Sequence, residues 1–158
     1  MMRSAFGLAA LLAGFAFLAP ATAEDKKDDK GWVQLFNGKD LTGWKTHPQS
    51  PGKWKVEDGI LIGSGPVSHL FSERGDYENF HYRIEAMIND KGNSGQYFRT
   101  AFGPGFPKGY EAQINSTHRD PQKTGGIYNF AKVLEQHHKP DEWFTQEVIA
   151  DGNHLNVL

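Results

Sequence analysis

Residues 80–88, FHYRIEAMI, contain the pattern that decides the fold class. Every second residue is apolar or aromatic, and those between are mostly polar or charged. A period of two is typical of a β-strand with one buried face. No stretch of the chain shows ten residues with a helical period of about 3.6. The sequence therefore predicts an all-β protein.

Short runs rich in aromatic and β-branched residues recur on both sides of this stretch, separated by clusters of Gly, Pro, Asn and Asp. The predicted strands are Val33–Phe36, Trp54–Val56, Ile60–Gly63, Leu70–Phe71, Phe80–Ile88, Ser94–Arg99, Tyr110–Asn115, Ile127–Tyr128, Trp143–Ala150 and His154–Leu158. Residues 57–59 (EDG) and 151–153 (DGN) have the residues of hairpin turns. About ten short strands at this spacing predict a β-sandwich or barrel.

Composition narrows the functional classes. The chain has 158 residues, 38% hydrophobic and 23% charged, with a formal net charge of −2. That length suggests one domain, and the apolar content argues against a disordered chain. A pI near 6.4 argues against nucleic acid as a partner. The absence of cysteine from the sequence excludes disulfides, thiol nucleophiles and Cys-ligated metal sites.

The N-terminus has the features of a secretory signal peptide, predicted over residues 1–23. Arg3 precedes an apolar stretch from Ala5 to Leu18, and Ala-Thr-Ala at 21–23 is a small-x-small cleavage signal. A retained membrane anchor is the alternative, but the stretch is shorter than the roughly 20 residues of a membrane span. We therefore expect an exported bacterial protein, periplasmic or extracellular. Residues 24–30 are all charged and predict a solvated linker.

The predicted domain covers residues 31–158, and its C-terminal end is unusual. His154–Leu158 would be the second strand of a hairpin, and the chain stops there on an apolar residue. A strand without a partner exposes its backbone groups. We expect that the final sheet strands are missing; a short native edge strand is the alternative.

The runs 80–88, 94–99 and 110–115 all alternate, which allows polar side chains to gather. If the three strands are neighbours, one sheet face carries Arg83, Glu85, Tyr97, Arg99, Glu111 and Gln113. Planar Arg, Gln and carboxylate groups can hydrogen-bond sugar hydroxyls. Gly-rich loops at 102–107 and 124–126 would allow close approach of a ligand. The alternative is a solvated face with cross-strand ion pairs, each contributing roughly 0.2–1 kcal/mol.

Histidines offer little evidence for a metal. His118 with Asp120, and the pair His137 and His138, are the only clusters that would suggest one. Neither has the three-ligand spacing of a zinc site. The sequence therefore predicts no metal and no cofactor, although a bound divalent ion, such as a structural Ca²⁺, remains an alternative.

Six motifs together resemble the 3-keto-disaccharide hydrolase domain family. They are GWVQLFNGKDLTGW (31–44), WKVEDGIL (54–61), YENFHYRIEAMINDKGNSGQYFR (77–99), GYEAQI (109–114), TGGIY (124–128) and DEWFTQEVIADGNHLNVL (141–158). The resemblance implies a concanavalin-like jelly-roll β-sandwich of two antiparallel sheets. Family members continue past the last motif with further strands, in agreement with the expected truncation. The family often has Asp where this chain has Asn115, which weakens any role of that position as an acid or metal ligand.

The resemblance also implies hydrolysis of a glycosidic bond in a sugar oxidised at C3, so the expected partner is a 3-keto-glycoside or disaccharide. A C3 ketone acidifies the C2 proton, a base removes it, the enolate expels the glycosidic oxygen, and water adds. This route needs a base, an acid and a group that stabilises the enolate.

Site roles follow from this chemistry. Glu111 is the leading acid/base candidate, and Arg99 is expected at the enolate oxygen. Gln113 and Tyr97 are expected to position hydroxyls, and Tyr128 and His118 are further proton donors. Arg83 and Glu85 complete the predicted substrate-binding face.

Two non-enzymatic functions stay open. Jelly rolls also serve as lectins, so a carbohydrate-binding module would use the same face without turnover. A docking domain in a secreted assembly would instead use an exposed sheet edge. Only turnover separates the enzyme from the lectin-like module.

Overall fold

The computed structural model describes residues 31–158, so the predicted signal peptide and charged linker lie outside the described residues. Residues 35–158 form one compact unit that contains every strand of the described part. The strands are β1 (Trp44–Thr46), β2 (Lys53–Glu57), β3 (Ile60–Ser64), β4 (Leu70–Ser72), β5 (Phe80–Ala86), β6 (Ser94–Phe98), β7 (Tyr110–Ile114), β8 (Phe144–Asp151) and β9 (His154–Val157). Residues 31–158 contain no helix, and hence none there with the length and apolar character of a membrane span. The predicted all-β class is confirmed.

Eight of the ten predicted strands correspond to β2 through β9. Two predictions are wrong: Val33–Phe36 contains only a single-residue bridge, and Ile127–Tyr128 contributes only bridges at Ile127. The sequence did not predict β1, because its three residues, Trp-Lys-Thr, are too few to show alternation. The predicted turn at 57–59 is confirmed, with Asp58 and Gly59 at positive φ between β2 and β3. Gly152 takes a positive φ in the β8–β9 hairpin.

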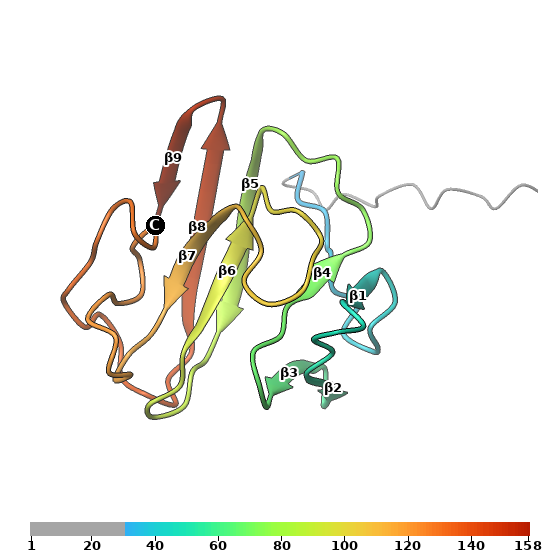
Figure 1. Ribbon diagram of the computed structural model, residues 1–158, viewed down its shortest axis with the longest axis horizontal. Coiled ribbons are helices and arrows are strands. Elements are labelled where there is room, and N and C mark those ends of the chain that lie inside the picture. The colour runs from blue at the N-terminus through green and yellow to red at the C-terminus, as the bar shows by residue number, and fades with distance from the viewer. Residues whose placement is uncertain (1–30) are drawn as a thin grey trace, which may run out of the picture. The chain divides into compact units, whose positions relative to one another are not determined.

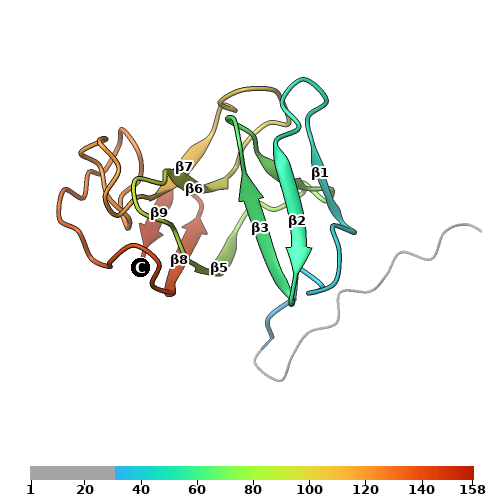
Figure 2. The same ribbon diagram turned by 90° about the horizontal axis from the view of Figure 1, so that it is seen from below.

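The strands form four antiparallel groups: β1–β4, β2–β3, β6–β7 and the three-stranded sheet β5–β8–β9. The β6–β7 pair lies over the β5–β8–β9 sheet as a second layer (Figures 1 and 2). This layering is that of a sandwich of antiparallel sheets. The β1–β4 and β2–β3 pairs lie beside the two layers in both views.

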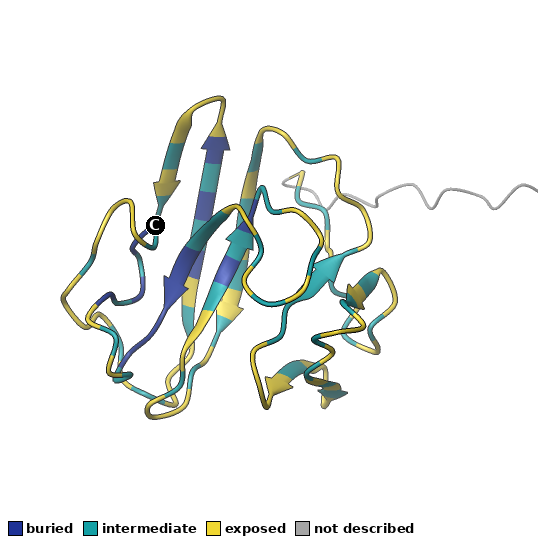
Figure 3. Cartoon of the chain, viewed as in Figure 1, coloured by how far each residue is buried: buried dark blue, intermediate teal, exposed yellow. Residues whose placement is uncertain are grey.

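The core lies between these two layers. Its buried residues are Phe98 on β6, Ala112 on β7 and Val148 on β8. Phe98 stacks on Tyr110 with ring centroids 5.5 Å apart and meets Phe80 of the opposite layer edge-on at 6.3 Å. Figure 3 shows the buried positions gathered along β6, β7 and β8. One side of these strands thus packs into the core; the opposite side includes the partly exposed Tyr97 of β6 and Glu111 of β7.

Two buried glutamines cross the interface between the layers. Gln146 of β8 donates from Nε2 to Gln96 Oε1 (3.2 Å) and to the Ala112 carbonyl (3.3 Å). Its Oε1 accepts the Gly125 amide at 3.1 Å. Gln96 in turn donates to the Tyr82 carbonyl of β5 at 3.1 Å. These polar groups are buried with hydrogen-bond partners, as buried amides must be.

One expectation about topology is wrong. β5 pairs with β8, whereas β6 pairs with β7. Arg83 and Glu85 are therefore on the outer face of the β5–β8–β9 sheet, in the layer opposite to β6 and β7. Alternation shows which residues share a face of one strand, but it does not show which strand is the neighbour.

Replacing Gln146 with alanine is expected to lower the free energy of unfolding by about 2–4 kcal/mol, because the Gly125 amide and the Gln96 oxygen lose buried partners. Urea denaturation measures the change. Gln49→Ala is the control, since the Gln49 side chain is exposed, and it should shift the value by less than about 0.5 kcal/mol. Equal losses in both variants would contradict the interlayer role.

Candidate functional site

Tyr97 and Glu111 face each other on the outer side of the β6–β7 pair. They are direct cross-strand partners, and directly opposed side chains of an antiparallel pair lie close enough to interact. Their neighbours along the strands, Phe98 and Ala112, point into the core. The register therefore holds this tyrosine–carboxylate pair on the surface of a rigid layer.

Glu111 occupies space that only glycine leaves free. A Cβ on Gly95 would lie 2.3 Å from Glu111 Oε1 and 2.5 Å from its Cγ. Both distances are far shorter than van der Waals contact, so any larger residue at 95 must displace the Glu111 side chain. The Gly in the motif SGQYF of β6 thus makes room for the carboxyl group.

Burial makes Glu111 a stronger base than an exposed carboxylate. Desolvation raises the pKa of Glu111, a hydrogen bond from Tyr97 partly lowers it, and the negative charge of Asp120 raises it again. The net pKa is above the ordinary value. Desolvation, together with the charge of and hydrogen bond to Glu111, raises the pKa of Tyr97, so this hydroxyl stays protonated and available as a donor.

A second tyrosine–carboxylate pair lies beside the first. The Tyr128 hydroxyl donates to Asp120 Oδ2 at 2.8 Å, and the Tyr128 amide donates to the Glu111 carbonyl at 2.9 Å. The bond to Asp120 raises the pKa of Tyr128, with smaller contributions from burial and nearby charge. Desolvation raises the pKa of Asp120, but hydrogen bonds from Gln122 and Tyr128 and the positive charge of Lys123 outweigh it, so the net pKa is lowered. Asp120 is thus held as an anion.

Asn115 organises the loop that carries Asp120. Its Nδ2 donates to the carbonyls of Asp120 (3.0 Å) and Gln122 (2.7 Å), and its Oδ1 accepts the His118 amide (2.9 Å). An aspartate could not make the first two contacts. Lys123 Nζ also donates to the Asp120 carbonyl at 3.0 Å. Asn115 therefore acts as a brace of this loop.

Tyr97, Glu111 and Tyr128 line a cavity of about 250 Å³ on the outer face of β6–β7. Its lining residues are Tyr97, Phe106, Pro107, Gly109, Glu111, Tyr128, Asn129 and Phe130. Three of the eight predicted site residues are among them, namely Tyr97, Glu111 and Tyr128. The cavity thus combines a carboxyl and hydroxyl groups with an aromatic wall, a usual composition for a small-molecule site.

Arg83 and Glu85 are on the outer face of the other layer, so the expectation that they share a face with Glu111 is wrong. On that face His81 Nε2 pairs with Glu147 Oε2. The two layers place β5 and the cavity on opposite sides of the core.

The guanidinium group of Arg99 donates its hydrogen bonds to backbone carbonyls. Its guanidinium donates to the Gly152 carbonyl at 2.6 Å and to the Glu78 carbonyl at 2.7 Å. A φ of 49° at Arg99 follows the last residue of β6 and breaks the strand alternation. Because of this, Arg99 ties two connections together and is not among the cavity-lining residues.

Gln113 and His118 are not among the residues that line the cavity. Gln113 is buried beneath residues 122–126, donates to the Gln122 carbonyl at 3.4 Å, and leaves its Oε1 without a partner among the described residues. His118 Nδ1 accepts the Asp120 amide at 3.2 Å, so this histidine contacts the loop that carries Asp120.

His69 is a site neighbour that the sequence did not predict. Its ring meets Tyr97 edge-on with centroids 4.5 Å apart and contacts Phe106 at 6.3 Å. Burial lowers the pKa of His69, partly offset by a hydrogen bond to the Gly105 backbone. Its position just before the short strand β4 carries no motif, so no sequence pattern signals it.

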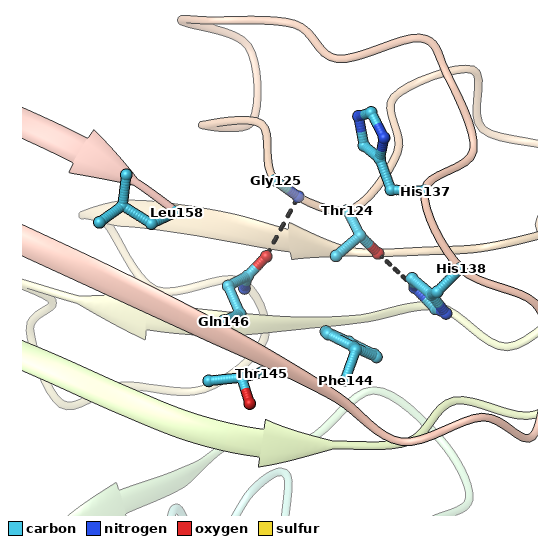
Figure 4. Close-up of a pocket in the computed structure, with 8 residues that line it drawn as sticks. All are labelled: Thr124, Gly125, His137, His138, Phe144, Thr145, Gln146 and Leu158. Carbon is cyan, nitrogen blue, oxygen red and sulfur yellow. Dashed lines mark hydrogen bonds between the residues drawn. The ribbon is translucent and has the colours of Figure 1, made fainter.

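A second cavity, of about 270 Å³, is lined by the first residues of β8, by residues 124–125 and 137–138, and by Leu158 (Figure 4). Thr124 Oγ1 and His138 Nε2 are 2.9 Å apart there, and His138 stacks on Phe144 with centroids 4.1 Å apart. It contains no carboxylate among its lining residues. Within residues 31–158, no three His, Asp or Glu side chains gather as a metal-binding group would.

Comparison with known proteins identifies the family. A family model described as a 3-keto-alpha-glucoside-1,2-lyase-like domain matches residues 31–158. The chain belongs to this family. It is the family that the six sequence motifs resemble, so that prediction is confirmed. No curated protein matches the chain.

Among solved structures, the chain is similar to one from Parabacteroides distasonis ATCC 8503 that is described as "a putative glycosyl hydrolase". The TM-score is 0.67 and the sequence identity 30%, over 78% of this chain and 65% of that one. The chain thus spans about two thirds of that protein's length. The similarity and the packed antiparallel sheets confirm the predicted jelly-roll sandwich.

Substitutions of Tyr97 and of Asp120 are expected to change the pKa of Glu111 in opposite directions. Tyr97→Phe should raise the pKa of Glu111 further, because the hydrogen bond that lowers it is lost. Asp120→Asn should lower the pKa of Glu111, because a like charge is removed. Carboxyl-carbon NMR measures both shifts, with the Glu111→Gln spectrum assigning the resonance.

Asp58→Asn in the exposed β2–β3 turn is the matched control for charge removal, and it should leave the titration of Glu111 unchanged. A Glu111 titration that is insensitive to both Tyr97→Phe and Asp120→Asn would show that the two tyrosine–carboxylate pairs are not coupled.

Proposed function

We propose that this protein cleaves the glycosidic bond of sugars oxidised to a ketone at C3, with Glu111 as the base that removes the C2 proton. The observation that carries the proposal is the half-buried Glu111, with its raised pKa, in a cavity between Tyr97 and Tyr128. Family membership and the glycosyl hydrolase description of the structural relative support this choice of substrate class.

The first step is proton abstraction. A proton on the carbon next to a ketone is acidic enough for a carboxylate whose pKa is raised toward neutral pH. Glu111 takes the C2 proton, and the electron pair of the C2–H bond forms the C2–C3 double bond of an enolate. Desolvation of Glu111 is the physical reason that it, rather than Asp120, takes this role: the pKa of Asp120 is lowered.

The enolate oxygen requires hydrogen-bond donors. Tyr97 and Tyr128 are protonated hydroxyls in the cavity, and their raised pKa values favour donation of a hydrogen bond over loss of the proton. The hydroxyl proton of Tyr97 is donated to Glu111 before the reaction, and it becomes available to the enolate oxygen once Glu111 has taken the C2 proton. In this proposal Tyr97 then donates to the C3 oxygen, whereas Tyr128, whose proton is donated to Asp120, accepts a hydrogen bond from a neighbouring hydroxyl.

The enolate then re-forms the C3 ketone and makes a C1–C2 double bond as the C1–O bond breaks. The departing oxygen takes the proton that Glu111 holds, which releases the alcohol. Water adds at C1, and a proton is returned to C2, which gives the free 3-keto sugar. The elimination step alone is the lyase reaction named in the family description; water addition makes the overall reaction a hydrolysis.

This route uses carboxyl and hydroxyl groups of the chain, so we propose that it needs no added cofactor. We also propose that the protein acts after export, on the basis of the signal peptide predicted over residues 1–23. The carbohydrate is then met outside the cytoplasm.

Glu111→Gln is expected to lower kcat/KM on a nitrophenyl 3-keto-glucoside by about 10²–10⁴-fold, the usual contribution of a general base. Release of nitrophenol measures the rate. Glu85→Gln is the matched control, because Glu85 is exposed on the opposite layer, and it should retain wild-type turnover.

Wild-type turnover by Glu111→Gln would overturn the assignment of the base. If the wild-type protein shows no turnover but binds the sugar saturably, and Glu111→Gln binds it equally well, the protein is a carbohydrate-binding module instead.

Gly95→Ala should lower kcat at least tenfold without removing any proposed catalytic group, because its Cβ would displace the Glu111 carboxyl. Circular dichroism establishes that the variant is folded. Gly103→Ala is the control, since a Cβ there meets nothing within 4 Å. Full activity in folded Gly95→Ala would contradict the placement of the carboxyl that the mechanism needs.

A further inference from the structure

We propose that Phe106 and Phe130 form a subsite for the leaving group of the glycoside, and that this subsite selects leaving groups with a flat apolar ring face. An aryl ring and a second pyranose ring both have such a face. The inference rests on the proposed function, because it places the departing half of the same substrate.

Both phenylalanines line the cavity and are largely exposed. Phe106 is 75% exposed and Phe130 is 71% exposed. Single exposed apolar residues are common on protein surfaces and need no explanation. Two aromatic rings from separate loops at one cavity are different, because a ligand there would cover both of them.

The loop around Phe106 is held in place. The Gly105 amide donates to Ser50 Oγ at 3.2 Å, and the Ala101 amide donates to the Lys108 carbonyl at 3.1 Å. His69 hydrogen-bonds to the Gly105 backbone and contacts the ring of Phe106. The exposed ring therefore projects from a fixed backbone.

The turn at Phe130 is also held by hydrogen bonds, which join Asn129 to Gln122. Asn129 has a φ of 63°, a conformation that costs energy for any residue except glycine and is tolerated best by Asn and Asp. The Asn129 amide donates to Gln122 Oε1 at 3.0 Å, and Gln122 Nε2 donates to Asn129 Oδ1 at 3.3 Å. The Phe130 ring contacts Tyr110 with centroids 5.2 Å apart. The unfavourable backbone conformation of Asn129, next to the exposed ring of Phe130, points to a functional reason for the position of that ring.

The size of the cavity leaves part of the substrate outside it. Its volume of about 250 Å³ is below the range of about 300–1,000 Å³ for sites that enclose drug-sized ligands. One sugar ring bound against Glu111 would fill it. The other half of a glycoside must then lie over the edge of the cavity, where Phe106 and Phe130 present their exposed rings.

The test compares three 3-keto-glucosides that differ only in the leaving group: methyl, nitrophenyl and glucosyl. Phe106→Ala and Phe130→Ala should each lower kcat/KM for the nitrophenyl and glucosyl substrates by about tenfold, as expected for the loss of one stacked ring. The methyl substrate, which has no ring to stack, should change by less than about twofold. Both residues are exposed, so the melting temperature should stay close to that of the wild type.

Leu134→Ala is the matched control, because Leu134 is 65% exposed and does not line the cavity. It should leave all three substrates unaffected. A selective loss with the nitrophenyl or the glucosyl substrate alone supports the subsite and shows which ring it accepts. Equal losses on all three substrates, or none, would overturn the subsite while wild-type turnover upholds the proposed function. If the wild-type protein cleaves none of the three, the proposed function itself fails.

Discussion

The side-chain amide of Gln146 makes the hydrogen bonds that join the two layers of the sandwich, and it also holds the segment that leads to Tyr128 at the site. It lies on β8, bonds to β6 through Gln96 and to β7 through the Ala112 carbonyl, and holds the Gly125 amide. Gly125 begins the segment that leads to Tyr128. A buried amide is costly unless all its groups are paired, so this contact fixes one arrangement of the layers. The face that carries Glu111 is a consequence of that arrangement.

Alternation along the chain predicted the strands well, since exposure alternates from residue to residue along β5 and most of β8, and β6 buries Gln96 and Phe98. It could not predict the pairing, and Arg83 and Glu85 were assigned to the wrong face for that reason. A period of two is a property of one strand, whereas pairing depends on contacts far apart in the chain. The β5–β8 pair joins residues far apart in the chain, such as Phe80 with Ala150 and Arg83 with Glu147.

The two strand residues of the site, Tyr97 and Glu111, were predictable because alternation within each strand assigns them to the face opposite the apolar residues Phe98 and Ala112. Asp120 and His69 were not predictable in these roles, since their positions depend on loop contacts. Arg99 shows the same limit in reverse: its type and spacing suggest a site residue, but a positive φ turns it toward the Glu78 and Gly152 carbonyls. A local backbone conformation of this kind leaves no periodic signal in the sequence.

The site thus divides into a floor and walls with different physical origins. The floor, Tyr97 and Glu111, belongs to a hydrogen-bonded strand pair whose other face is core, so moving it would disturb the sandwich. The walls come from loops braced by a few side-chain contacts, such as Ser50 to Gly105 and Gln122 to Asn129. A change in a wall residue can alter which leaving group binds at little cost in stability, whereas a change under the floor cannot. Chemistry and specificity are therefore separable in this fold, and the same carboxyl can serve different glycosides as the wall residues change.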